Sequence, residues 1–303
     1  MKLRFFYSAL ALTVLFGIIN TSCSKERLED DTPELNSYPQ TTSYMNDKAQ
    51  EEQMYTVDSL GTGPITGQQG TQMWPHKEIF MYPNGDSVHY PFQIGIIEIY
   101  KPIDMAYSQM PTVSDNNLLT TAGEVRVKVY KDGTELVLRP GKFLVLDYPT
   151  SSTQDNNMRV YYGQESGSIV NWTDPNDSIQ NLDTASAHYY RVFTHRMNWI
   201  NCDYFSSYTG SMASFSFTST TEDITGLGKF IYFNNRKSMM QVYSATSPDV
   251  PVGEDVKILF FGKNASNQLF YYYNDTIVNP SNNYDITLTQ TTETELDSLL
   301  NSF

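Results

Sequence analysis

The chain has 303 residues, a formal net charge of −14, 22 tyrosines and two cysteines. An acidic surface of this kind repels phosphate backbones, which excludes nucleic-acid binding as the main activity. The high tyrosine content favours strands over helices, so an all-β protein is expected.

The chain starts like a bacterial secretion signal that ends at Cys23. Lys2 and Arg4 form a basic start, residues 5–19 are almost continuously apolar, and small polar residues lead to the cysteine. The apolar run is shorter than the roughly 20 residues that span a hydrocarbon core. The segment resembles the signal of bacterial lipoproteins, which implies removal of residues 1–22 and lipidation of Cys23. Cleavage without lipidation and a retained signal anchor are the alternatives.

Residues 23–52 are predicted to be a lipidated N-terminus followed by a flexible tether. Residues 24–31 are short, charged and mainly acidic, and they resemble the export signal of lipoproteins of the Bacteroidota. That resemblance implies an outer-membrane lipoprotein on the cell surface, with a periplasm-facing position as the alternative. Residues 32–52 remain polar and contain two prolines, which is typical of a spacer.

A first β-rich domain is predicted over residues 53–207. Residues 125–129 alternate valine with basic residues, and a Lys-Asp-Gly turn follows, which predicts a hairpin over residues 124–138. The apolar residues 143–146 predict a strand buried on both faces. Further strands are expected at residues 92–100, where the alternation slips and favours a bulge or two-sided burial, and at residues 158–162 and 189–193.

A second domain is predicted over residues 208–303, after a linker-like stretch at residues 206–212. About six or seven short strands with regular turns indicate an immunoglobulin-like β-sandwich. A short α-helix is expected at the C-terminus, because Thr292 and Glu295 have the spacing of a capping box and leucines 296, 299 and 300 form an apolar stripe. The fold class is therefore all-β, with two β-sandwich domains behind the tether.

Several short strings between about residues 66 and 205 resemble a group of uncharacterised lipoproteins of the Bacteroidota. The most specific string is Trp199-Ile200-Asn201-Cys202-Asp203, and the others lie at residues 65–71, 97–105, 119–124, 138–142, 158–163 and 170–172. The end of the chain, at residues 294–300, also resembles theirs. The resemblance covers most of the mature chain. It implies an architecture and a cellular address, and it implies no activity.

Catalytic residue types gather at one place in the sequence. His195, Cys202 and Asp203 could supply a base, a nucleophile and an orienting carboxylate, but no catalytic motif frames them. The apolar neighbourhood of Cys202 instead favours a small buried hydrophobic residue. We therefore expect no enzyme, no catalytic residue and no cofactor.

One segment carries weak signals for calcium. Asp174, Asn176 and Asp177 supply the oxygen ligands that calcium prefers, yet the spacing lacks the glycine and the terminal glutamate of a helix-loop-helix calcium site. An ordinary solvated turn is the expectation, with calcium binding as the alternative.

Two functional classes remain after these exclusions. The first is a non-enzymatic surface lipoprotein that contacts the membrane through its anchor and binds or assembles with an envelope or extracellular protein. The second is a glycan-binding module, because tyrosine and tryptophan rings stack on sugar faces. Trp74, Trp172 and Tyr272 are the candidate contacts for such a ligand.

Overall fold

The computed structural model describes residues 34–59, 63–114, 117–150, 154–166, 169–173, 179–183, 188–205 and 208–303. Strands dominate these residues, the helices are short, and one helix ends the chain, which confirms the predicted all-β class. Residues 35–303 form one compact unit. We call residues 53–205 the N-terminal lobe and residues 208–303 the C-terminal lobe.

The N-terminal lobe is a sandwich of two antiparallel sheets. The larger sheet has the strand order β1-β5-β7-β15-β11-β12, and the smaller sheet has the order β13-β14-β10-β3-β2. Their facing side chains form a closed core that includes Ile94, Val127, Leu146 and Cys202. The strands are β1 Gln53–Val57, β2 Ile65–Thr66, β3 Gln72–Met73, β4 Phe80–Met81, β5 Phe92–Ile99, β6 Val113–Ser114, β7 Asn117–Lys131, β8 Thr134–Glu135, β9 Val137–Leu138, β10 Leu144–Thr150, β11 Arg159–Ser166, β12 Ile169–Thr173, β13 Ile179–Asp183, β14 His188–Thr194 and β15 Asn198–Phe205.

The C-terminal lobe is built around a five-stranded sheet of order β19-β18-β21-β22-β24. Two strand pairs, the parallel pair β17-β23 and the antiparallel pair β16-β20, contribute to the core on one face of it. The strands are β16 Met212–Ala213, β17 Phe215–Thr218, β18 Gly228–Phe233, β19 Ser238–Gln241, β20 Val250–Pro251, β21 Asp255–Lys263, β22 Leu269–Ile277, β23 Asn282–Asp285 and β24 Thr289–Thr291. Single-turn 3-10 helices lie at Lys77–Ile79 and Ile224–Gly226.

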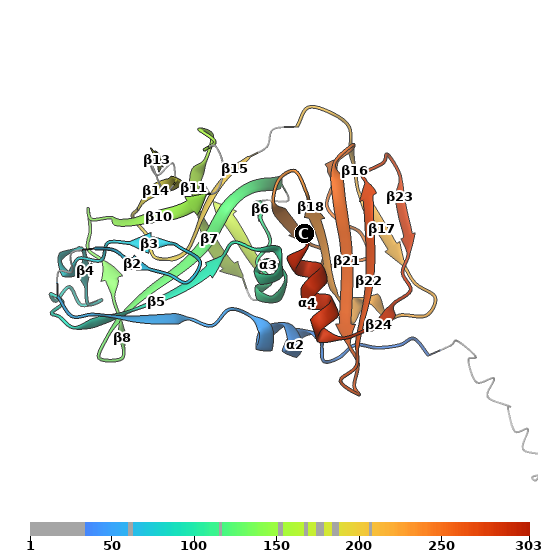
Figure 1. Ribbon diagram of the computed structural model, residues 1–303, viewed down its shortest axis with the longest axis horizontal. Coiled ribbons are helices and arrows are strands. Elements are labelled where there is room, and N and C mark those ends of the chain that lie inside the picture. Colours follow the sequence, from blue (N-terminus) through green and yellow to red (C-terminus); the bar gives the residue numbers. More distant parts are fainter. Residues whose placement is uncertain are drawn as a thin grey trace, which may run out of the picture. The chain divides into compact units, whose positions relative to one another are not determined.

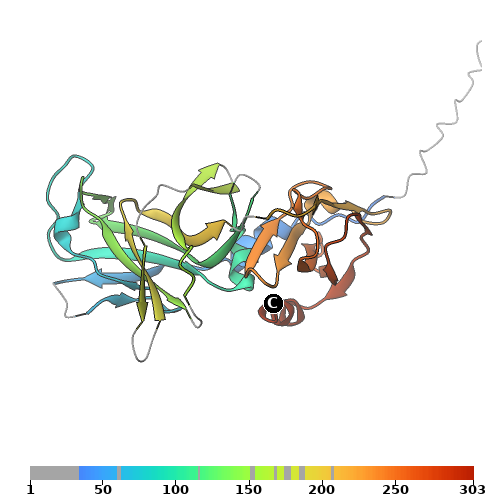
Figure 2. The same cartoon turned by 90° about the horizontal axis from the view of Figure 1, so that it is seen from above.

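A third core joins the two lobes. Ile97 and Ile99 of β5 pack into it from the N-terminal lobe, and Leu259 and Phe261 of β21 pack into it from the C-terminal lobe. Three helices complete it: α2 (Thr41–Lys48), α3 (Pro102–Ser108) and α4 (Glu293–Asn301). Figure 1 shows these helices where the two groups of strands meet; in Figure 2, turned by 90°, the α2 and α3 segments lie between the groups and α4, at the C-terminus, lies beside the C-terminal strands. The predicted boundary at residue 207 falls between the lobes, and the division of residues 53–303 into two separate domains stays a prediction.

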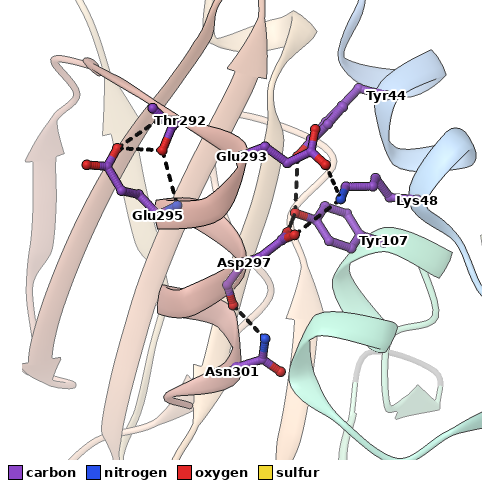
Figure 3. A network of polar contacts seen from close by, with 8 residues as sticks. All are labelled: Tyr44, Lys48, Tyr107, Thr292, Glu293, Glu295, Asp297 and Asn301. Carbon is purple, nitrogen blue, oxygen red and sulfur yellow. Dashed lines mark hydrogen bonds and ion pairs between the residues drawn. The ribbon is translucent and has the colours of Figure 1, made fainter.

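Polar contacts tie the three helices together. Lys48 at the end of α2 donates to Glu293 and, over 3.2 Å, to Asp297 of α4. The Tyr107 hydroxyl of α3 also donates to Asp297, as Figure 3 shows. Burial opposes the charge on Lys48, but these hydrogen bonds outweigh it and raise the pKa of its ammonium group. The predicted capping box at Thr292 and Glu295 is confirmed, which fixes where α4 begins.

The structure also corrects two expectations from the sequence and adds a helix. The predicted tether ends early, because Tyr44 and Met45 of α2 are buried in the core between the lobes. Helix α3 was not predicted, although Pro102 at its first turn is a recognised helix-start signal. Residues 143–146 are not buried on both faces, because Phe143 is 43% exposed and Val145 is half-buried between the buried Leu144 and Leu146.

The irregular alternation at residues 92–100 has a clear cause. Strand β5 keeps a regular register with β7, so no bulge interrupts it. Ile94 and Ile96 face the core between the two sheets, while Ile97 and Ile99 face the core between the lobes. The alternative of two-sided burial is therefore confirmed.

Candidate functional site

A β-bulge in the central strand β7 positions the candidate site. The register between β7 and β15 shifts by one residue, so that Cys202 lies opposite Gly123 and Asp203 lies opposite Thr121. Gly123 has a φ of +137°, a backbone conformation that a side chain would strain. A Cβ atom added there would also lie 2.1 Å from Cε1 of Tyr100. Bulges often re-aim side chains beside functional sites.

A cavity of about 740 Å³ opens beside this bulge. Residues of both lobes line it: Gln68, Gln69, Tyr100, Lys101, Thr120, Thr121, Ala122, Gly123, Pro149, Thr150, Asp155, Met158, Tyr190, Tyr204, Asn235, Arg236 and Lys237. Three tyrosine rings, three side-chain amides and three basic groups thus converge on one volume. This size and this mixture of rings with a few polar groups are typical of a small-ligand site.

One wall of the cavity depends on a buried glutamate. Glu98 of β5 accepts hydrogen bonds from the backbone N–H groups of Gln69 (2.8 Å) and Thr71 (2.9 Å). It also accepts a hydrogen bond from the Gln53 side chain. The hydroxyl of Tyr100 shares a further hydrogen bond of 2.8 Å with the Thr71 hydroxyl. These bonds hold in place the Gln69 backbone and the Tyr100 ring, two residues that line the cavity.

The opposite wall is the turn between β18 and β19 of the C-terminal lobe. Lys237 has a φ of +51° and is exposed, while Arg236 forms an ion pair with Glu254. The charge of Arg236 is therefore largely matched within the protein. Lys237 and Lys101 supply exposed positive charge at the rim, and Asp155 supplies one carboxyl group.

A buried polar cluster lies behind the bulge, on the face of the sheet that is turned toward the C-terminal lobe. Glu124, Asn201 and Asp203 are completely buried, and Thr121 nearly so. Burial raises the pKa of the Asp203 carboxyl well above its usual value. Burial, together with the neighbouring Asp203, does the same for Glu124. Thr121 belongs both to this cluster and to the cavity lining.

The structure does not bring the predicted ligand contacts together. Trp172 is completely buried, and its indole nitrogen donates to the backbone carbonyl of Pro111 over 2.9 Å, so its ring has no free face. Trp74 is half-buried beneath the guanidinium of Arg191. Tyr272 is half-buried against Phe260 in the other lobe. None of the three lines the cavity.

The remaining site predictions divide into two groups. Cys23 and the calcium candidates Asp174, Asn176 and Asp177 lie outside the described residues. The candidate catalytic residues lie in different environments, because Cys202 is fully buried in the sandwich core while His195 is exposed. Burial, joined by the nearby Asp203, raises the pKa of the Cys202 thiol well above its usual value, which disfavours the thiolate.

Sequence reasoning missed the residues of the cavity and, apart from Asp203, those of the buried polar cluster. An isolated glycine inside an alternating strand is a recognised signal for a bulge, and Gly123 has that pattern. No local sequence pattern indicates that residues 68, 123 and 236 line one cavity, because their proximity depends on how the two lobes pack.

Comparison with known proteins adds no relative, because no family model, curated protein or solved structure matches the chain. Within the described ranges, no three acidic, histidine or cysteine side chains group as a metal site. Nor does any helix there have the length and apolar character that crossing a membrane requires.

Proposed function

We propose that this protein is a non-enzymatic lipoprotein of the cell envelope, anchored through Cys23 and displayed at the surface of the outer membrane. The leader before Cys23 and the acidic residues after it support this address. The folded unit begins at Leu35, so only residues 23–34 would separate the lipid from the body. A binding role close to the membrane fits this short connection.

The cavity between the lobes supports binding as the activity. It holds tyrosine rings beside side-chain amides and exposed lysines. The apolar surface of the rings favours contact with a ligand, and the amides and ammonium groups fix its orientation through hydrogen bonds. We therefore place the ligand of the proposed binding module in this cavity, which is the observation on which the proposal depends.

A saccharide is the narrower candidate for the ligand. Tyr100 and Tyr204 supply ring surface, while the exposed side chains of Gln68 and Asn235 supply groups that both donate and accept hydrogen bonds. Sugar rings present an apolar face and a rim of hydroxyls that match this combination. An envelope or extracellular protein that inserts a polar segment is the broader alternative.

Glycan-array binding and capture from solubilised envelopes would test the proposal together. Tyr204→Ala, which removes a ring from the cavity, is expected to reduce binding at least about tenfold. Tyr272→Ala removes a half-buried ring outside the cavity and serves as the matched control. Equal binding by the wild type and Tyr204→Ala, or loss only in Tyr272→Ala, would contradict the assignment of the ligand to this cavity.

A further inference from the structure

Three buried carboxylate oxygens behind the bulge have no hydrogen-bond partner among the residues that the structure describes. They are Oε1 and Oε2 of Glu124 and Oδ1 of Asp203. Both side chains are completely buried. Burying such groups unpaired is strongly unfavourable, and an unpaired buried polar atom in a folded protein commonly indicates a water molecule or an ion.

The hydrogen bonds around Asp203 run in one direction and leave it as an acceptor. The backbone N–H of Gly123 donates to Thr121 Oγ1 over 2.9 Å, and this hydroxyl donates to Asn201 Oδ1 over 3.2 Å. The Asn201 amide then donates to Asp203 Oδ2. These bonds hold the Asp203 carboxylate in place through Oδ2, while its Oδ1 has no hydrogen-bond partner among the described residues.

Among the residues that the structure describes, no ion pair joins Glu124 or Asp203 to a basic side chain. Arg126 lies on the same face of β7 as Glu124, two residues along. Its Nη2 atom donates to Glu52 over 3.2 Å and its guanidinium lies 5.6 Å from the centre of the Trp199 ring, while its buried Nε has no hydrogen-bond partner within the described ranges. The raised pKa of Glu124 agrees with this geometry, because a nearby guanidinium would lower it.

We propose that Glu124 and Asp203 bind a hard divalent cation, with calcium as the best match. Two carboxylates neutralise a charge of +2, and a glutamate with both oxygens free can bind calcium through both. Asn201 would act as the group that orients Asp203. Thr121 borders both the cluster and the cavity, so the ion would enter from the cavity side.

Calcium titration of the full chain in detergent would test this inference directly. After removal of bound ions with a chelator, calcium is expected to raise the Tm of the wild-type protein and to produce a binding isotherm. Glu124→Gln keeps the shape of the side chain and removes its charge, so calcium binding should weaken at least about tenfold. Asp203→Asn should do the same.

The calcium candidates outside the described residues provide the matched control. Asp174→Asn/Asp177→Asn should leave the calcium response unchanged, and its loss in this variant would overturn the proposal by assigning the ion to that segment. Terbium luminescence adds a readout on the wild-type protein, because Trp199 lies on the same face of β15 as Asp203. A wild-type protein without a calcium-dependent Tm shift, isotherm or terbium signal would also overturn it. Neither result depends on the ligand of the cavity.

Discussion

Replacing Gly123 with alanine should destabilise the protein through two separable effects. A side chain at a φ of +137° strains the backbone by about 1–3 kcal/mol. The new Cβ would also collide with the Tyr100 ring, and moving that ring breaks its hydrogen bond with Thr71, a further loss of about 0.5–1.5 kcal/mol. We expect a total loss of roughly 2–4 kcal/mol in the free energy of unfolding.

Gly133→Ala is the matched control for the backbone effect. Gly133 has a φ of +78°, and nothing lies within 4 Å of an added Cβ, so only strain of about 1–2 kcal/mol is expected. Urea unfolding followed by circular dichroism gives both values. When Tyr100 is also replaced by alanine, Gly123→Ala should lower the free energy of unfolding by no more than Gly133→Ala does, because the ring that collides with the new Cβ is gone. Equal losses for Gly123→Ala and Gly133→Ala in the wild-type background would refute the described packing of the bulge.

Three further predictions concern stability. Trp172→Phe should cost about 1–3 kcal/mol in urea unfolding, because it leaves the buried Pro111 carbonyl without its donor; a change within error would show that the indole is not buried as described. Thr292→Ala should cost about 1 kcal/mol by removing the cap of α4, and an unchanged midpoint would contradict the capping box. Lys229 is buried, and desolvation lowers the pKa of its ammonium group. Between that lowered value and 10.5 the unfolded chain binds more protons than the folded protein, so wild-type stability should rise with pH across this window. Urea unfolding of Lys229→Met should lack that rise, and parallel pH profiles would count against the burial of the charge.

Local patterns in the sequence predict much of the fold. The alternation at residues 125–129, the capping box of α4 and the two-sided burial of β5 are each confirmed. All three depend on periodicity or on the spacing of residues within one element. Such local patterns predict the structure correctly wherever tertiary packing favours the same conformation.

The core between the lobes explains most of the errors. Glu124 lies on the face of β7 that alternation marks as polar, and it is buried because the C-terminal lobe and α3 cover that face. Polar residues 41–48 look like a spacer, yet Tyr44 and Met45 anchor them as a helix. Trp172 looks available for a ligand and instead fills the same core. Long-range packing decides these residues, and no local pattern carries that information.

The Trp-Ile-Asn-Cys-Asp string combines a feature that the local pattern predicts with one that depends on long-range packing. Its residues alternate between the sandwich core, which takes Ile200 and Cys202, and the opposite face, which takes Trp199, Asn201 and Asp203. All five are buried. A structural role could be anticipated from the apolar residues, whereas the polar cluster required the register with β7.

Mass spectrometry of the native protein, purified from envelope membranes, would test the proposed anchored binding module most directly. We predict an N-terminal peptide that begins at Cys23 and carries the added mass of a diacylglyceryl group and a further acyl chain. A peptide that retains residues 1–22, or one with an unmodified Cys23 thiol, would contradict the lipid anchor and with it the proposed role at the envelope.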